Sequence, residues 1–477
     1  MDSTDIEEKS FLLSKFDYVF GTTKGIISLI ILIEFLIILF LSTFSEPVVN
    51  VLGFPILPIS LDDAHRAGRI IAMYHALAVP FIAAVAFYLI DICDVRPTFL
   101  SPIRWTLIPG AFLTGVSGIV FAYILPLNWA VHGLYLVGLS LSFFAGLLLL
   151  ISLIPSKNFP DPEKHKEGPY LWGINLEQFN LMLVTTCILI STIIGGIAGA
   201  YFGNGMEAFL AEDIVRLEVH TLFERMIISH LHIMVALLAA AVMLIVFRYT
   251  EAKGRWYLIA MICTIPGLII MSVGAWLVIP DFPNAHMIIN VGSIFLLFAA
   301  FILTIYGWDK TSKSVLGPDY DSASWFTRII AVLKDPVKFG LYFQFIWVNL
   351  VVTFPGVFVA INLDVYRRAT YEIVERSFTT GHWHVLVTLT AIILLLLVVD
   401  YFNLKGYMRQ VSGWLLILGS LIGFGFSVFY MLRGPNADKT LFFILMDIGV
   451  TLIFAGTAII CLILLVKFVE TRKNQIN

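Results

Sequence analysis

The sequence predicts an all-α, polytopic membrane protein with about twelve transmembrane helices. The chain has 477 residues, of which 59% are hydrophobic and 13% charged, and its mean hydropathy is +0.92. A soluble globular protein carries about 25% charged residues. The net charge of −3 gives no reason to expect nucleic acid as a partner. The four cysteines are scattered, so the sequence predicts no disulfide framework, no zinc site and no CxxCH motif.

Twelve hydrophobic stretches are long enough to cross a bilayer, which takes about 20 residues of helix. In chain order they are 25–45, 70–92, 106–126, 131–153, 178–202, 226–247, 257–279, 286–307, 341–362, 382–402, 412–432 and 441–467. They form one predicted membrane domain, 25–467, between the tails 1–24 and 468–477. The longest linker, 308–340, includes "SWFTRIIAVLKDPVKF", which fits either a short interfacial amphipathic helix or an ordinary loop.

The charges in the linkers predict how the spans are oriented. The linkers after even-numbered spans and the two tails carry most of the lysines and arginines, whereas the linkers near 127–130 and 280–285 carry none. The positive-inside rule therefore predicts a multi-pass plasma-membrane protein with both termini in the cytoplasm. Several arginines on the outer side break this pattern, among them Arg367, Arg368 and Arg433.

Seven of the ten histidines lie near the outer ends of even-numbered spans, at roughly one depth in the membrane. They are His75, His132, His230, His232, His286, His382 and His384. Ionisable side chains inside a membrane are costly and usually functional. Neutral imidazole is a common ligand of metals and of haem iron. A single one of them could be an interfacial residue or a helix–helix contact, but seven at one depth indicate a layer of cofactors.

Two of these histidine pairs have an HxH spacing. Residues i and i+2 of an α-helix point about 200° apart. His382 and His384 therefore face opposite flanks of their span and predict a partition between two haems. The same holds for His230 and His232 in "SHLHIM".

Twelve spans with a histidine on span 2 and HxH on span 10 resemble the catalytic subunit I of the haem–copper oxidase superfamily, which includes cytochrome oxidases and nitric oxide reductases. Three patches are similar to that family: "HRAGRIIAMYHALAVPFIAAVAFYLID" (65–91), "LDVYRRATYEIVERSFTTGHWHVLV" (363–387) and "MLRGPNADKTLFFILMDIGVTLIFAG" (431–456). The resemblance implies a subunit I-like fold that binds two haems, b-type since no c-type attachment motif is present.

The resemblance also implies roles for individual residues. His75 and His384 would be the axial ligands of a low-spin haem, and His382 would be the proximal ligand of a second haem that reduces O₂ or NO. Arg433, with Arg367 or Arg368, matches the region that binds the haem propionates. A carboxylate partner would offset the cost of burying these arginines.

The second metal of the family, copper or non-haem iron, is where the sequence departs from the pattern. The family uses a histidine on helix six and a His-His pair at helix seven, but span 7 here has no histidine. Met234 stands where the reductases carry a glutamate, and the helix-six tyrosine of the oxidases is missing. His230 is the candidate assisting residue at the catalytic face, with His232 and His286 as candidate ligands of a second metal or a further haem.

Three functions follow from these residues. The first is a respiratory oxidoreductase that passes electrons from the low-spin haem to a gas-reducing haem on His382, assisted by His230. The second is a bis-histidine electron-transfer cytochrome without a gas site, in which His230 fills the open face. The third is a twelve-span transporter with histidine proton relays. Because the chain has no visible motif for electron entry, we expect a cytochrome c-like or cupredoxin-like subunit, or a quinol, as electron donor.

Overall fold

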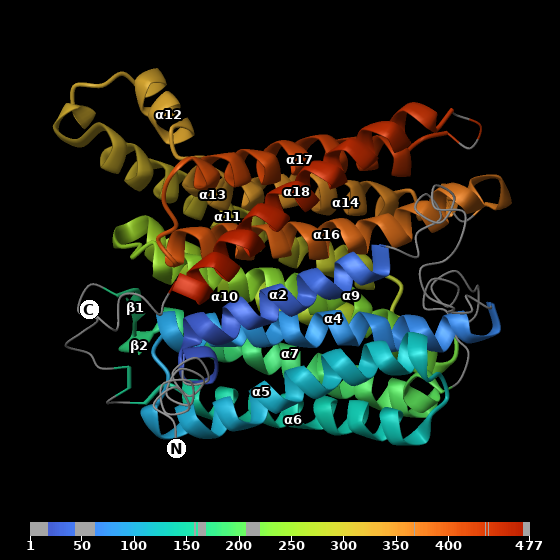
Figure 1. The fold of residues 1–477 in the computed structure, drawn as a ribbon. Coiled ribbons are helices and arrows are strands. Elements are labelled where there is room, and N and C mark those ends of the chain that lie inside the picture. The colour runs from blue at the N-terminus through green and yellow to red at the C-terminus, as the bar shows by residue number, and fades with distance from the viewer. Residues whose placement is uncertain are drawn as a thin grey trace, which may run out of the picture.

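The structure, a computed structural model, is an all-helical bundle in which long helices run side by side between two ends (Figure 1). It describes residues 18–42, 63–156, 159–160, 168–206, 220–366, 368–434, 436 and 438–470. In these ranges the only sheet is a small antiparallel hairpin, β1 (Tyr170–Leu171) with β2 (Ile174–Asn175). The predicted all-α class is confirmed, while most of the two expected tails lies outside the described residues.

The long helices follow the order of the hydrophobic stretches. They are α2 (Thr23–Ser42), α4 (Asp63–Ile92), α5 (Pro97–Ile119), α6 (Trp129–Leu153), α7 (Leu176–Tyr201), α9 (Leu222–Tyr249), α10 (Gly254–Trp276), α11 (Ala285–Leu316), α13 (Pro336–Val348), α14 (Phe354–Ile361), α16 (Glu372–Tyr401), α17 (Tyr407–Met431) and α18 (Thr440–Glu470). Shorter elements join them: the π-helical turns η1 (Val120–Ile124) and η4 (Asn349–Thr353), the 3₁₀ turns η2 (Gly203–Gly205), η3 (Gly317–Tyr320) and η5 (Ala369–Tyr371), and the helices α12 (Trp325–Leu333) and α15 (Leu363–Tyr366).

Among the described residues, eleven helical segments are long and apolar enough to cross a membrane, so the chain is a polytopic membrane protein. They correspond to the second to twelfth predicted spans. The first predicted span, 25–45, coincides with the apolar 20-residue helix α2, which is not among the eleven. The total of twelve therefore stays a prediction.

The ninth span is interrupted. It consists of α13, the π-helical turn η4 and α14, and Pro355 lies in the first turn of α14. Proline has no backbone N–H. It is tolerated in the first turn of a helix because the N–H groups of that turn have no acceptor within the helix. The π-helical turn inserts extra backbone at this point, a feature that often accompanies functional sites.

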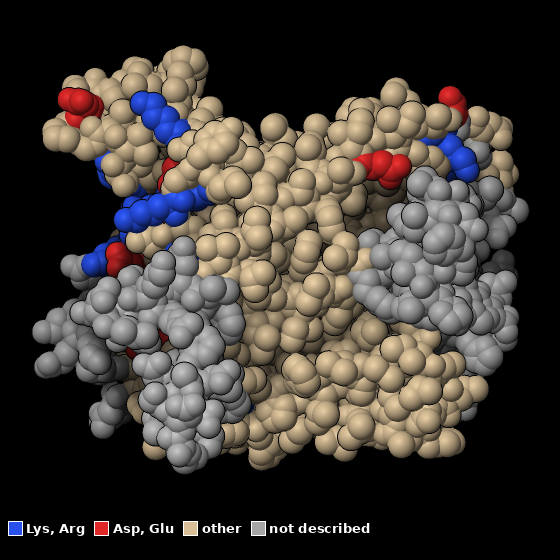
Figure 2. All heavy atoms as spheres, viewed as in Figure 1, with Lys and Arg blue, Asp and Glu red and all other residues tan. Residues whose placement is uncertain are grey.

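Side chains from the linkers after even-numbered spans meet at one end of the bundle. Arg248, at the end of α9, lies 3.0 Å from Asp94, which follows α4. Arg409, near the start of α17, lies 2.7 Å from Asp335, which precedes α13. Figure 2 shows charged side chains toward the two ends of the visible face and a middle band without them. This is the charge distribution expected of helices that cross an apolar layer.

Helix α9 lies at the centre of the arrangement that positions the histidines. It packs against α4, α7, α10 and α16, and it also contacts α11. From Val242 to Phe247 its side chains are fully or almost fully buried. A helix that is apolar all round and buried on all sides is typical of the interior of a membrane bundle. The two flanks of α9 therefore face different neighbours, α4 and α7 on one side and α11 and α16 on the other.

Candidate functional site

In three imidazoles of the predicted layer, the Nδ1 atom is hydrogen-bonded to a backbone carbonyl. The Nδ1 atoms of His75 and His232 donate to carbonyls one turn earlier in their helices, at 2.9 and 2.7 Å. The Nδ1 of His230 donates to the carbonyl of Ser191 on α7, at 2.9 Å. A carbonyl oxygen can only accept, so the proton of each neutral ring is on Nδ1 and the lone pair is on Nε2. This is how metal-ligating histidines are oriented in proteins.

His230 and His232 point to opposite flanks of α9, in agreement with their spacing. His230 packs on α7, on the flank of α9 that faces α4, the helix of His75. The ring of His232 meets that of His286 at 5.3 Å between centroids, nearly perpendicular, and lies 6.5 Å from the ring of Trp383, the neighbour of His382 on α16. The structure thus places His230 on the flank of α9 toward α4, and His232 against His286 on the flank toward α16.

The HxH pair of α16 is also divided between two surroundings. His382 packs against Phe378, and its buried Nδ1 has no hydrogen-bond partner among the described residues. His384 is exposed, and its Nε2 lies 3.4 Å from the hydroxyl of Tyr74 on α4. Tyr74, the neighbour of His75, is therefore the α4 side chain that the structure places against His384.

Two glycines leave room beside the histidine rings. A Cβ on Gly195 of α7 would lie 2.5 to 2.7 Å from atoms of the His230 ring, and a Cβ on Gly356 of α14 would lie 2.9 Å from Cε1 of His382. Both distances are too short for a real contact, so a larger residue would displace the imidazole. Sequence reasoning missed Tyr74, Ser191 and both glycines, because their roles depend on which helices are neighbours.

His132 has different surroundings. Its side chain is buried, and its Nε2 donates to the carbonyl of Asn204 at 3.2 Å, which places the ring proton on Nε2. Its ring also packs against Phe121 and Tyr135. These contacts make His132 a structural residue that joins α6 to the turn η2.

Of the three arginines expected near haem propionates, the structure buries one. Arg433 is 9% exposed, its guanidinium lies 3.9 Å from the ring centroid of Tyr430, and no carboxylate pairs with it among the described residues. A nearly buried guanidinium without a carboxylate fits a site for an anionic group. Arg368 is exposed, and Arg367 lies outside the described residues.

The second-metal site has only partial support. No cluster of three or more His, Cys, Asp or Glu side chains that could hold a metal ion occurs in the described ranges. His232 and His286 come together, but two imidazoles alone are fewer ligands than a tetrahedral or octahedral metal usually takes from protein.

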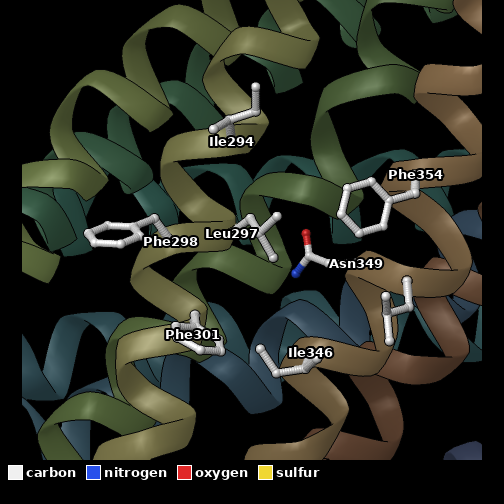
Figure 3. A pocket seen from close by; sticks show the side chains of 8 residues that line it. Ile294, Leu297, Phe298, Phe301, Ile346, Asn349 and Phe354 are labelled. Carbon is white, nitrogen blue, oxygen red and sulfur yellow. The ribbon is translucent and has the colours of Figure 1, made fainter.

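An apolar pocket of about 310 Å³ lies between α11 and the interrupted ninth span (Figure 3). Its lining is Ile294, Leu297, Phe298, Phe301, Ile346, Asn349, Leu350 and Phe354. The Asn349 amide donates to the carbonyl of Phe345 at 2.7 Å and accepts from Thr353 at 2.9 Å, so its polar groups are already paired. A charged substrate would find no counter-charge in this lining.

No protein-family model matches the chain, and no curated protein or solved structure is significantly similar to it. The resemblance to the haem–copper oxidases therefore rests on the residues quoted above.

Proposed function

We propose that this protein is a membrane haem oxidoreductase related to subunit I of the haem–copper oxidases. One observation carries the proposal: partly buried imidazoles on α4 and α9 have Nδ1 fixed by a backbone carbonyl, which leaves the Nε2 lone pair as a ligand. Haem held by such imidazoles supplies a one-electron iron couple and, where an axial position is open, a site for O₂ or NO.

The proposal has two haem sites, on opposite flanks of α9 and α16. At the first, His75 would be an axial ligand, with His384 as its partner by resemblance and His230, on the flank of α9 that faces α4, as a second candidate. At the second, His382 would be the ligand on α16, with the His232–His286 pair on the flank of α9 toward α16. Arg433 would neutralise a propionate. The carbonyl bonds fix the tautomer and orientation of the rings and would raise their basicity as ligands.

The two redox functions differ in what occupies the far side of the second site. In the first, that side stays open, with the His232–His286 pair assisting gas reduction, with or without copper or non-haem iron; the assisting role expected of His230 is not supported at this site, because His230 lies on the opposite flank of α9. In the second, a histidine occupies it and the protein is a bis-histidine electron-transfer cytochrome. The Nε2 lone pair of His232, on the flank of α9 toward α16, supports this second candidate. Either would take electrons from a quinol or from a cytochrome c-like or cupredoxin-like subunit in a plasma membrane.

The test is the optical spectrum of the purified, dithionite-reduced protein before and after carbon monoxide. CO binds reduced haem iron only where an axial position is open or easily vacated. A CO shift on about half of the haem would support the gas reductase. A haem spectrum that CO leaves unchanged would support the cytochrome. A protein without haem would overturn the proposal and return the transporter to first place.

Single substitutions sharpen this test. We expect His75→Ala and His382→Ala each to lose about one of two haems, because each removes an axial ligand. His132→Ala is the matched control, since His132 is also a buried imidazole of this layer but has its Nε2 proton bonded to a carbonyl. Comparing His384→Ala with His230→Ala shows which of the two completes the first site. Equal haem loss in all variants, the control included, would indicate misfolding and speak against specific ligation.

A further inference from the structure

The linker between the eighth and ninth spans is folded. Helix α11 continues to Leu316, η3 turns the chain, and the nine-residue helix α12 follows before α13 begins at Pro336. Figure 1 shows α12 projecting sideways from the edge of the bundle, at the end where α2 begins and α18 ends. This is the end that carries Arg248, Asp94 and Arg409. Because α12 is a helix, its side chains have fixed directions, and one face of it points away from the bundle.

Helix α12 has a broad apolar face that is exposed. Its large exposed side chains are between 37% and 72% exposed: Trp325, Phe326, Ile329, Ile330 and Leu333. At about 100° per residue they fall within one sector of about 140°. Thr327, Arg328 and Ala331 occupy the other side of the helix. Most of the apolar side of α12 is therefore exposed, unlike that of a helix which packs its apolar side on protein and turns its polar side to water.

Contacts at both ends prevent α12 from rolling this face inward. At its start, the Arg328 guanidinium stacks on the Tyr320 ring at 4.1 Å and donates to the carbonyl of Asp321 at 3.3 Å. Just beyond its end, Asp335 caps α13 and is bound by both terminal nitrogens of Arg409, at 2.7 and 3.2 Å. On the inner side, Ala331 and Val332 are buried.

We propose that α12 lies in the headgroup layer of the membrane, with its apolar face in the acyl-chain boundary. The occupant of this face is a phospholipid surface. Interfacial helices typically carry Trp, Phe and other apolar side chains on one face and basic residues beside it; here the basic residues are Arg328 within α12 and Lys334 just after it. A second copy of the chain is the weaker occupant, because a stable interface needs about 800 Å² per partner, more than one nine-residue helix offers. This inference is independent of haem binding.

The test uses nitroxide spin labels on the full-length protein, reconstituted in vesicles of phosphatidylcholine and phosphatidylglycerol. Labels go on Ile329→Cys in the apolar face, on Thr327→Cys on the opposite side, and on Ile305→Cys in the eighth span as a membrane reference. All three native residues are solvent-exposed or exposed to lipid, so the fold should tolerate the label. Collision rates with oxygen and with a water-soluble nickel chelate report the depth of each label.

We expect the label at 329 to lie about 5–10 Å below the headgroup boundary, with high oxygen and low nickel accessibility. The label at 327 should have higher nickel accessibility than 329. High nickel accessibility at 329, similar to that at 327, would overturn the proposal, because the face would then be in water. Low accessibility to both reagents at 329 would also overturn it, because the face would then be covered by protein.

Discussion

At the scale of single residues, the structure separates charges that stabilise the bundle from charges that do not. Arg409 binds Asp335 through two nitrogens and Asp400 through one of them at 2.8 Å, and Tyr249 donates to Asp400 at 3.0 Å. The three charged side chains are between 14% and 20% exposed. The network ties α16, α17 and the start of α13 together.

We expect Arg409→Gln to lower the free energy of unfolding by roughly 3 kcal/mol, because it leaves two half-buried carboxylates facing each other. Lys313→Gln is the control: Lys313 and Asp309 lie 2.6 Å apart but are 56% and 42% exposed. Breaking such an exposed pair should cost less than about 1 kcal/mol. Unfolding in mixed micelles with increasing dodecyl sulfate measures both. Equal losses would show that burial does not distinguish the two ion pairs.

At the scale of elements, glycines set how closely helices approach. Where α17 crosses α18, a Cβ on Gly449 would overlap the backbone nitrogen and Cα of Gly423. Small residues at such crossings let backbones meet, which is a main source of helix association in membranes. We expect Gly449→Ala to destabilise the protein by about 1–3 kcal/mol, the cost of overpacking a tight contact.

The control for this crossing is Gly425→Ala, also on α17. A Cβ there meets only the Trp347 ring at 3.5 Å, an ordinary van der Waals distance. Alanine should then be neutral or stabilise by up to about 1 kcal/mol through its helix propensity. The same unfolding measurement applies. A destabilised Gly425→Ala with a neutral Gly449→Ala would mean that the described crossing of α17 and α18 is incorrect.

Sequence reasoning could predict the elements but not their neighbours. A run of about 20 apolar residues has few alternatives to a transmembrane helix, so the second to twelfth spans could be placed from hydropathy. The opposite orientations of His230 and His232 followed from the helical period alone. The placement of His230 on the flank of α9 toward α4 could not be predicted, because it depends on which helices pack together. Pro355 predicts a kink in the ninth span, but no local pattern marks the π-helical turn η4 just before it.

At the scale of the whole molecule, the linkers that share a basic charge pattern also lie at one end of the bundle. Lys24, at the start of α2, lies 4.8 Å from the Tyr401 ring at the end of α16, and Lys467 of α18 donates to the carbonyl of Phe402 at 3.1 Å. The start of α2 and the last part of α18 therefore share one end of the bundle with the linker after the tenth span. Loop charge alone had predicted this grouping.

The remaining question at this scale is which end faces the cytoplasm, and the positive-inside rule predicts that it is the end with the basic linkers. Cysteine labelling of the full chain in intact cells tests this. The first variant is Asn284→Cys, in the linker 280–285, which has no Lys or Arg. The second is Ser322→Cys, in the linker 308–340, which is rich in lysine. Both native residues are exposed. A membrane-impermeant maleimide should label position 284 directly and position 322 only after the cells are permeabilised. The reverse pattern would invert the topology, and the histidine layer would then lie nearer the cytoplasm than the outer surface. For the proposed oxidoreductase, this labelling also decides on which side of the membrane an electron donor should be sought.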